Sequence, residues 1–217
     1  MIKAVIFDLD GTLLDTIEDL ADSMNIVLEK HHFPTHDIHS YKYFVGDGIK
    51  EFAARAIPEA YRSDGKLCAA IGAEAMEEYA GRWHNKTRPY DGIPEMLEEL
   101  SRRKIKKAVL SNKPHDFTIL TTRHFFNGIF DDVQGEIPSK RPRKPDPAGV
   151  FEILDKFSVG KNETLYLGDT ATDMLTAKAA GIYPVGALWG FRTQEELLEN
   201  GARALISKPH ELIELLS

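Results

Sequence analysis

Two patterns of apolar and polar positions divide this chain. Residues 3–9 form an almost unbroken apolar run of β-branched and aromatic side chains, which is typical of a parallel strand buried on both faces. Residues 15–30 repeat apolar positions at helical spacing and predict an amphipathic helix, with Asp15 or Thr16 as its cap. Residues 49–83 continue with helical patterns and contain no convincing strand.

After Pro89 the pattern changes, and strand-like runs alternate with helix-like ones. Expected strands cover residues 106–112, 164–169, 182–190 and 202–207. Expected helices cover residues 94–100, 115–126, 148–157, 170–181 and 210–216. Such alternation predicts an α/β fold with a parallel sheet wound on both faces. Because the helical stretch does not fit it, we expect a core from residues 1–14 and 89–217, and a separate helical unit inserted at residues 15–88.

Composition narrows the functional classes. Hydrophobic residues make up 42% of the 217 residues and charged residues 28%, as in ordinary globular proteins. The formal net charge of −7 makes the chain a poor general binder of nucleic acid or anionic membranes, because their phosphates are repelled. The single cysteine, Cys68, excludes an internal disulfide. The N-terminal apolar run is too short for a signal peptide or a membrane span, so we expect a cytoplasmic protein.

Chemically useful side chains follow the ends of the expected strands. Ligands bind at the carboxyl ends of parallel strands, so these side chains meet at one edge of the sheet if the strands are neighbours. They are Asp8, Asp10, Gly11 and Thr12 after the first strand, Ser111 and Asn112 at the end of the second, Lys144 in a later loop, and Gly168, Asp169 and Asp173 around the end of the third.

The charges of this set predict its chemistry. Carboxylates gathered at one site repel each other, and a divalent cation such as Mg²⁺ removes that cost. The cation attracts a phosphate dianion, while Lys144 and the Ser111 hydroxyl neutralise and orient phosphoryl oxygens. Backbone N–H groups around Gly11 and Asn112 complete the cradle. Taken singly, each motif also fits a turn, a helix cap or a surface lysine, but their order along the chain favours phosphoryl transfer.

Four segments, FDLDGTLLD, LSNK, KPDP and GDTATD, resemble the four ordered motifs of the haloacid dehalogenase-like hydrolases. The resemblance covers essentially the whole chain and implies a Rossmann-like parallel sheet core with an inserted α-helical cap domain after the first motif. Within the family the chain is most similar to phosphoglycolate phosphatases. Two features depart from their pattern: Thr170, where these enzymes often have Ser, and the unusually basic segment EIPSKRPRKPD. Neither departure affects the core chemistry, but both weaken the assignment of one particular substrate.

The resemblance also implies roles for the candidate residues. Asp8 attacks phosphorus and forms an aspartyl-phosphate, while Asp10 protonates the leaving alcohol and then activates the hydrolytic water. Asp8, the backbone carbonyl of Asp10, and Asp169 ligate Mg²⁺. Thr12 orients Asp10, and Asp173 steadies Lys144 or a metal-bound water. The expected substrate-binding set is Thr12, Ser111, Asn112 and Lys144, with Gly11 and Gly168 in support.

Three weaker signals stay open. The basic run at residues 140–144 is either a nucleic-acid patch or, as we favour, a lining of the site mouth or a solvated surface. The histidines fit no standard zinc spacing and suit a loop between helices; they are His31, His32, His36 and His39. Residues 45–48 either bind an anionic substrate group through backbone N–H groups or simply start a helix.

We therefore expect a Mg²⁺-dependent phosphatase of a small phosphate monoester, with 2-phosphoglycolate as the best guess. It is expected to act as a monomer or homodimer, without nucleic-acid or membrane partners. The alternative within the same family is a sugar phosphomutase. The alternative from another class is a phospho-accepting signalling module without turnover. Such receiver modules carry the phosphorylated aspartate on a middle strand, whereas Asp8 follows the first strand.

Overall fold

The chain forms two compact units. A computed structural model describes residues 1–138 and 140–216. The first unit combines Met1–Leu14 with the described part of Pro89–Ser217, and the second unit is Asp15–Arg88. The chain passes between the units along two short strands, β2 (Leu14–Asp15) and β3 (Arg88–Pro89), which form a two-stranded sheet.

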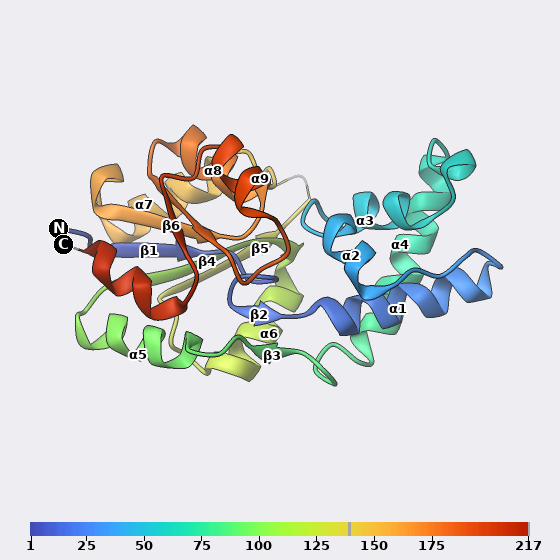
Figure 1. The fold of residues 1–217 in the computed structure, drawn as a ribbon, viewed down its shortest axis with the longest axis horizontal. Coiled ribbons are helices and arrows are strands. Elements are labelled where there is room, and N and C mark those ends of the chain that lie inside the picture. The colour runs from blue at the N-terminus through green and yellow to red at the C-terminus, as the bar shows by residue number, and fades with distance from the viewer. Residues whose placement is uncertain (139, 217) are drawn as a thin grey trace. The chain divides into compact units, whose positions relative to one another are not determined.

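A parallel sheet organises the first unit (Figure 1). Among the described residues it contains six strands in the order β5-β4-β1-β6-β7-β8. Their bounds are β1 Ala4–Phe7, β4 Lys106–Pro114, β5 Asp132–Glu136, β6 Thr164–Gly168, β7 Tyr183–Ala187 and β8 Ala204–Ile206. Phe7 at the end of β1 lies opposite Val109 of β4 and Leu167 of β6, and each of these pairings is parallel. The predicted α/β fold with a parallel sheet is thus confirmed.

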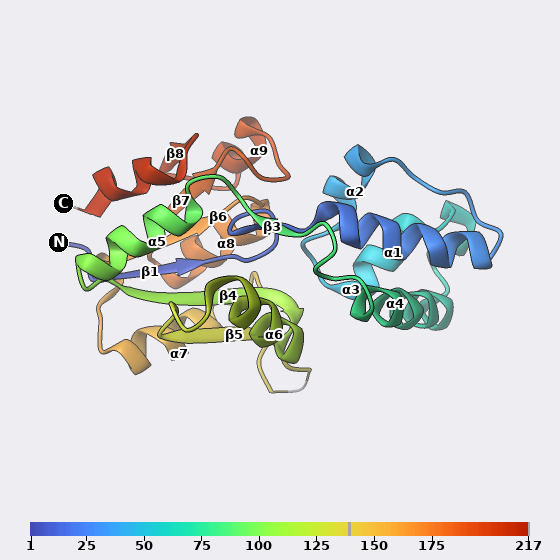
Figure 2. The same ribbon diagram turned by 90° about the horizontal axis from the view of Figure 1, so that it is seen from below.

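Helices cover both faces of this sheet, as the views in Figure 1 and Figure 2 show. One face carries α5, α6 and a C-terminal 3₁₀ helix, and the other carries α7 and α8. The bounds are α5 Ile93–Arg102, α6 His115–Phe126, α7 Ala148–Phe157, α8 Ala171–Ala180, α9 Gln194–Glu199, η2 Lys161–Glu163 and η3 Pro209–Leu216. This two-sided cover is why the strands read as apolar runs.

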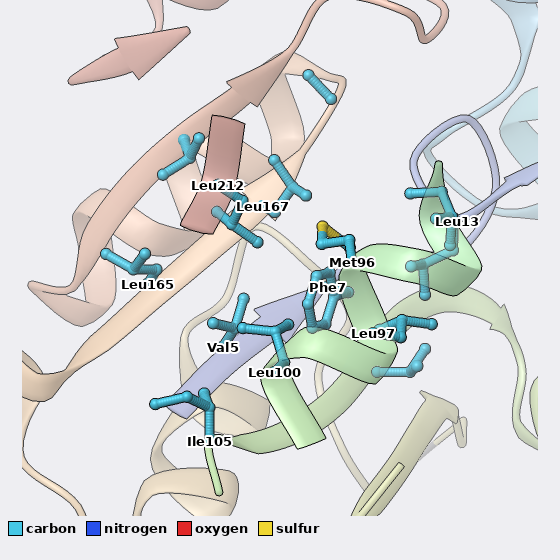
Figure 3. Close-up of a cluster of buried hydrophobic side chains, with 14 of the residues drawn as sticks. Val5, Phe7, Leu13, Met96, Leu97, Leu100, Ile105, Leu165, Leu167 and Leu212 are labelled. Carbon is cyan, nitrogen blue, oxygen red and sulfur yellow. The ribbon is translucent and has the colours of Figure 1, made fainter. Parts of the chain in front are cut away.

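Figure 3 shows a hydrophobic cluster in which α5 and the C-terminal 3₁₀ helix pack on the sheet. Val5 and Phe7 of β1 lie beside Leu97 and Leu100 of α5, and all four side chains are fully buried. Burying each such side chain stabilises the fold by roughly 1.5–3 kcal/mol. The packed core holds the strands rigidly, and the polar residues at their carboxyl ends therefore have defined positions.

The second unit is helical. It contains α1 Ile17–Lys30, α2 Ile38–Phe44, α3 Ile49–Ala56, η1 Glu59–Tyr61 and α4 Gly65–Ala80. α1 packs along α4, and α3 packs on α4 as well. The buried carboxylate of Asp19 joins the start of α1 to the end of the unit. It accepts hydrogen bonds from the backbone N–H groups of Lys86 and Thr87, at 3.0 and 2.8 Å, and from the Thr87 hydroxyl at 2.8 Å.

The structure differs from the sequence expectations at several elements. Strand β5 was not expected, because DVQGE contains a single apolar side chain and gives no strand pattern. Helices α2 and α9 were also missed, because at seven and six residues both are too short to show a helical repeat. His39 lies inside α2, so the loop expected for the histidines is wrong at that position. Thr16 is the cap residue of α1, but its side chain makes no capping bond. The last segment is a 3₁₀ helix.

None of the helices in the described part of the chain combines the length and the apolar character that crossing a membrane requires.

Candidate active site

The candidate site lies at the carboxyl ends of three neighbouring strands of the first unit. Asp8 directly follows β1, Ser111 and Asn112 lie in the last part of β4, and Asp169 directly follows β6. Because β1 pairs with both β4 and β6, whose neighbouring positions Figure 1 shows, these residues reach the same edge of the sheet although they lie far apart in the sequence.

A buried lysine lies at the centre of the site. The Lys144 ammonium is 2.8 Å from Asp8 Oδ1 and 2.7 Å from Asp173 Oδ1. The Asn112 side chain fixes the lysine backbone, because it accepts from the Lys144 N–H at 2.8 Å and donates to its carbonyl at 3.1 Å. Burial by itself lowers the pKa of Lys144, but the negative charges of Asp173 and Asp8 outweigh it and hold the pKa well above its usual value. This lysine is therefore a fixed positive charge.

Asp169 is held from two sides. The Thr12 hydroxyl donates to its Oδ1 at 2.7 Å, and the backbone N–H of Phe191, in the loop after β7, donates to its Oδ2 at 2.9 Å. Burial, followed by repulsion from Asp173, raises the pKa of Asp169 to about 7, against the effect of these two hydrogen bonds. The carboxylate is thus positioned firmly but is costly to charge without a cation.

Asp8, the candidate nucleophile, is also costly to charge. Burial and the charges of Asp173 and Asp169 raise the pKa of Asp8 well above its usual value, although Lys144 acts in the opposite direction. One oxygen each of Asp8, Asp169 and Asp173 lies within 4.8 Å of the others, which is a spacing that a metal ion can bridge. Hard carboxylate oxygens suit Mg²⁺, so the donor set fits such an ion.

Asp173 occupies the first turn of α8 and uses both oxygens within the protein. Its Oδ2 accepts from the Thr170 N–H at 3.1 Å and the Thr170 hydroxyl at 2.7 Å, which forms a capping box. Its Oδ1 faces Lys144 and the buried Tyr166 hydroxyl, which is 3.3 Å away. Asp173 therefore contacts Lys144, and the supporting role that the resemblance implies for it stays a prediction.

Asp10 faces a second lysine. The ammonium of Lys113 is 3.1 Å from Asp10 Oδ1 and 3.3 Å from Oδ2. The Lys113 side chain is only 4% exposed, whereas that of Asp10 is 20% exposed. The acid–base candidate is thus the more accessible partner of this ion pair.

Two glycines allow the carboxylates to come close. Gly11 has a φ of +87°, and a Cβ at this position would clash with the carboxylate of Asp169. A Cβ at Gly168 would clash with the side chain of Asp173. Both residues support the site by leaving room for an acidic side chain.

The expected residues come together, and the side chain of one of them, Thr12, has a contact other than the one expected. Thr12 was expected to orient Asp10, but its hydroxyl donates to Asp169, because the turn that starts at Leu9 directs this buried side chain toward β6. Asn112 was expected to bind substrate through nearby backbone N–H groups, which stays a prediction, while its side chain bonds the backbone of Lys144. The Ser111 hydroxyl is buried and accepts from the Lys113 N–H at 3.2 Å.

Other contributors were missed in the sequence. Lys113 is part of the LSNK motif but received no role, and its place directly after Ser111 and Asn112 was the available signal. The Phe191 N–H and the neighbouring Gly190, where a Cβ would clash with Asp169, come from the loop after β7. That loop also follows the carboxyl end of a parallel strand, so the same rule pointed to it.

The weaker signals have local contacts. Arg141 in the basic run donates to Glu152 of α7 at 2.6 and 2.8 Å. His31 lies 2.9 Å from Glu74, and the His36 ring nitrogen donates to the Ala56 carbonyl at 2.7 Å. Arg55 bonds Asp47 in the loop at residues 45–48. These contacts tie the segments to their own units.

Comparison with known proteins agrees with this geometry. The family model of haloacid dehalogenase-like hydrolases matches residues 5–187. A phosphoglycolate phosphatase from Pseudomonas syringae pv. tomato is 30% identical over 97% of this chain and 78% of its own length. One from Vibrio parahaemolyticus is 29% identical over 100% of this chain and 96% of its own.

A solved structure is similar as well. A crystal structure from Lactobacillus delbrueckii subsp. bulgaricus, named as that of a candidate phosphoglycolate phosphatase, superposes with a TM-score of 0.92 at 28% identity and covers 99% of this chain and 98% of its own. The prediction that this chain is a phosphatase similar to phosphoglycolate phosphatases is therefore confirmed. With a family model that spans most of its length and a matching fold, this chain belongs to the haloacid dehalogenase-like hydrolases.

Proposed function

We propose that this enzyme is a Mg²⁺-dependent phosphatase that hydrolyses a small phosphate monoester, with 2-phosphoglycolate as the substrate we favour. One observation carries the proposal: the buried Lys144 ammonium lies between Asp8 and Asp173, with Asp169 beside them. A nucleophilic carboxylate, a fixed cation and a further carboxylate at one strand edge are what phosphoryl transfer requires. The names of the similar proteins support the choice of substrate.

In the first half-reaction, an oxygen of Asp8 forms a bond to phosphorus as the bond between phosphorus and the ester oxygen breaks. Asp10 gives its proton to that ester oxygen, so the leaving group departs as a neutral alcohol. Asp10 is the partly exposed carboxyl group of the site, which suits a group that must reach the leaving oxygen. The product on the protein is an aspartyl-phosphate.

In the second half-reaction, water attacks phosphorus and the bond to the Asp8 oxygen breaks. Asp10, now a carboxylate, takes the proton that the water loses. Inorganic phosphate leaves, and both aspartates return to their starting states. Lys144 balances charge on the phosphoryl oxygens throughout, because Asn112 and Asp173 hold its backbone and its ammonium in place.

The metal belongs to the same proposal. Asp8 and Asp169 would hold Mg²⁺ together with the backbone carbonyl of Asp10, since two buried carboxylates with raised pKa values gain most from a cation. The ion supplies positive charge for the phosphate dianion and lowers the cost of bringing Asp8 close to it. Thr12 and the Phe191 N–H keep Asp169 oriented for this role.

The helical unit at residues 15–88 is proposed to be the cap that selects the leaving group, as in capped members of the family. Its compact helical character supports this proposal. A cytoplasmic location and a monomeric or homodimeric state stay predictions.

The test is phosphate release from a panel of small phosphate monoesters, with Mg²⁺ and with EDTA, beside Asp8→Asn and Asp131→Asn. Asp8→Asn keeps the shape but removes the attacking oxygen, so turnover is expected to disappear. Asp131→Asn changes an aspartate that pairs with Lys106 away from these residues, and turnover is expected to continue. Absence of phosphate release from every ester contradicts the proposal. Isomerisation of a sugar phosphate with little release favours the mutase, and a long-lived phosphoprotein favours the signalling module.

A further inference from the structure

Lys113, which forms an ion pair with Asp10, is the charged residue of the site to which the phosphatase chemistry gives no task. Lys113 lies on β4, and its side chain extends to Asp10 in the turn after β1. Its ammonium contacts both oxygens of Asp10, and its side chain is almost completely buried. A buried ammonium loses its hydration, so its position within the site is held by the negative groups around it.

Distances place this ammonium beside the leaving group. To protonate the ester oxygen, Asp10 must come within roughly 2.6–3.2 Å of it. The Lys113 ammonium lies 3.1 Å from the same carboxylate. The ester oxygen and the ammonium therefore lie within about two hydrogen-bond lengths of each other. This reach is long enough for the ammonium to contact a negative group on the carbon next to the ester-bearing carbon.

Because the site already holds several carboxylates, a negatively charged leaving group needs a cation close to it. The chain carries a net charge of −7, and Asp8, Asp10, Asp169 and Asp173 all lie at this strand edge. Lys144 is engaged by Asp8 and Asp173. A leaving group with its own carboxylate adds one more negative charge, which is repelled unless a cation lies close to it. Lys113 is placed beside Asp10 to supply it.

We propose that Lys113 is a specificity-determining residue that pairs with a carboxylate on the leaving group, and so selects phosphate monoesters of short 2-hydroxy acids. This inference rests on the proposed function and names the feature of the substrate that the site recognises. When such a substrate binds, its carboxylate takes over one of the two contacts between Lys113 and Asp10. The Asp10 oxygen released in this exchange turns to the ester oxygen. An uncharged leaving group makes no such exchange.

The experiment compares two esters of the same size. In 2-phosphoglycolate the leaving group carries a carboxylate, and in 2-hydroxyethyl phosphate a neutral hydroxymethyl group takes its place. Steady-state kinetics with both esters are measured for the native chain, Lys113→Met and Lys113→Arg. Lys106→Met is the matched control, because Lys106 lies on the same strand at its other end and forms an exposed ion pair with Asp131.

Lys113→Met is expected to lower kcat/KM for 2-phosphoglycolate by roughly 10- to 100-fold more than for the neutral ester, the range that one charge-assisted hydrogen bond supports. Most of this difference is expected in KM. Lys113→Arg keeps the charge and is expected to restore part of the preference. Lys106→Met is expected to leave the preference unchanged. Equal losses on both esters in Lys113→Met overturn the inference, because they show that Lys113 only positions Asp10.

A binding measurement separates this inference from the proposed function. Calorimetry on Asp8→Asn, with and without the added Lys113→Met change, gives Kd for both esters in the absence of turnover. The added change is expected to weaken 2-phosphoglycolate binding and to leave 2-hydroxyethyl phosphate binding within about threefold. If the native chain releases no phosphate while this binding difference holds, the proposed function fails and the inference stands. If phosphate is released but the difference is absent, the inference fails alone.

Discussion

The two units each bury carboxylates, but they treat them differently. In the helical unit, Asp19 is only 1% exposed and accepts hydrogen bonds from two backbone N–H groups and one hydroxyl. In the sheet unit, Asp8 and Asp169 are also buried, and each lies close enough to other carboxylates for repulsion to add to burial in raising its pKa. The donors around Asp19 come from neutral groups that the fold itself fixes.

This difference distinguishes a structural carboxylate from a functional one. A buried carboxylate that accepts enough hydrogen bonds stabilises the fold and needs no bound cation. A group of buried carboxylates with too few positive charges stores repulsion, which a bound cation relieves. The carboxylates of the sheet unit therefore repel each other until a cation binds. The carboxylate of Asp19 in the helical unit is already stabilised by hydrogen bonds within the protein.

Removal of Lys144 is expected to have the largest effect. Lys144→Met leaves Asp8 and Asp173 facing each other without a cation, and breaking such a buried pair costs roughly 3–5 kcal/mol of unfolding free energy. Urea unfolding in EDTA at pH 8 measures this loss, which is expected to shrink at pH 5, because burial and repulsion raise the pKa of Asp8 and favour its protonation. Turnover is expected to fall by at least about 10²-fold.

The control is Lys156→Met, which removes an exposed lysine paired with Asp132. Equal urea midpoints for Lys144→Met and the native chain at pH 8 would show that the carboxylates of the sheet unit do not store the repulsion described above.

The next largest effect is expected at Asp19. Asp19→Ala leaves the N–H and hydroxyl of buried Thr87 and the N–H of exposed Lys86 without this acceptor, which costs roughly 2–3 kcal/mol. Urea unfolding gives the size of the loss. The matched change is Asp22→Ala, which removes a more exposed aspartate on the same helix that pairs with Lys86, and its urea midpoint is expected to stay unchanged. Similar losses for the two variants would contradict the structural role of Asp19.

The titration of Asp169 is expected to change the unfolding free energy by a smaller amount for each pH unit. Its pKa is raised from 3.8 to about 7 in the folded protein, so between these values the folded state holds a proton that the unfolded state has lost. The unfolding free energy of the metal-free protein therefore falls as the pH rises through this window, by about 1.4 kcal/mol per unit for this proton. Above pH 7 the folded carboxylate is charged and this contribution no longer changes.

Urea unfolding in EDTA from pH 5 to pH 8 measures the slope, and Asp169→Asn is expected to flatten it. Mg²⁺ needs the charged carboxylate, so added Mg²⁺ is expected to raise the midpoint more at pH 8 than at pH 5. The same Mg²⁺ effect at both pH values would argue against Asp169 as a ligand.

Much of the fold could be predicted from local pattern. The ranges expected for two helices coincide with α6 and α7, because their apolar positions repeat at helical spacing and clear breaks bound them. The strands β1, β4 and β6 were found because burial on both faces makes them continuous apolar runs. Strand β5 was missed, because an edge strand is held by pairing with β4 and needs no apolar run of its own.

The site divides in the same way. Asp8 and Asp169 were identified because they follow strand ends, where parallel sheets gather ligands, and Lys144 because its loop carries the KPDP motif. The partners of individual side chains were not predictable, because they depend on which way each side chain leaves its turn. Thus Thr12 bonds Asp169 although Asp10 is closer in sequence, and Lys113 reaches Asp10.

The sequence by itself determined the kind of protein this is: alternating buried strands and helices, an inserted helical stretch, and acidic and basic motifs whose order matches one hydrolase family. Periodicity and motif order are local properties, so they can be read along the chain. The tertiary structure decided which charges meet, by pairing β1 with both β4 and β6. Coulomb energy depends on distance and burial, and the packed sheet sets both, so the pairing of Lys144 with Asp8 and of Lys113 with Asp10 emerges only in the folded protein.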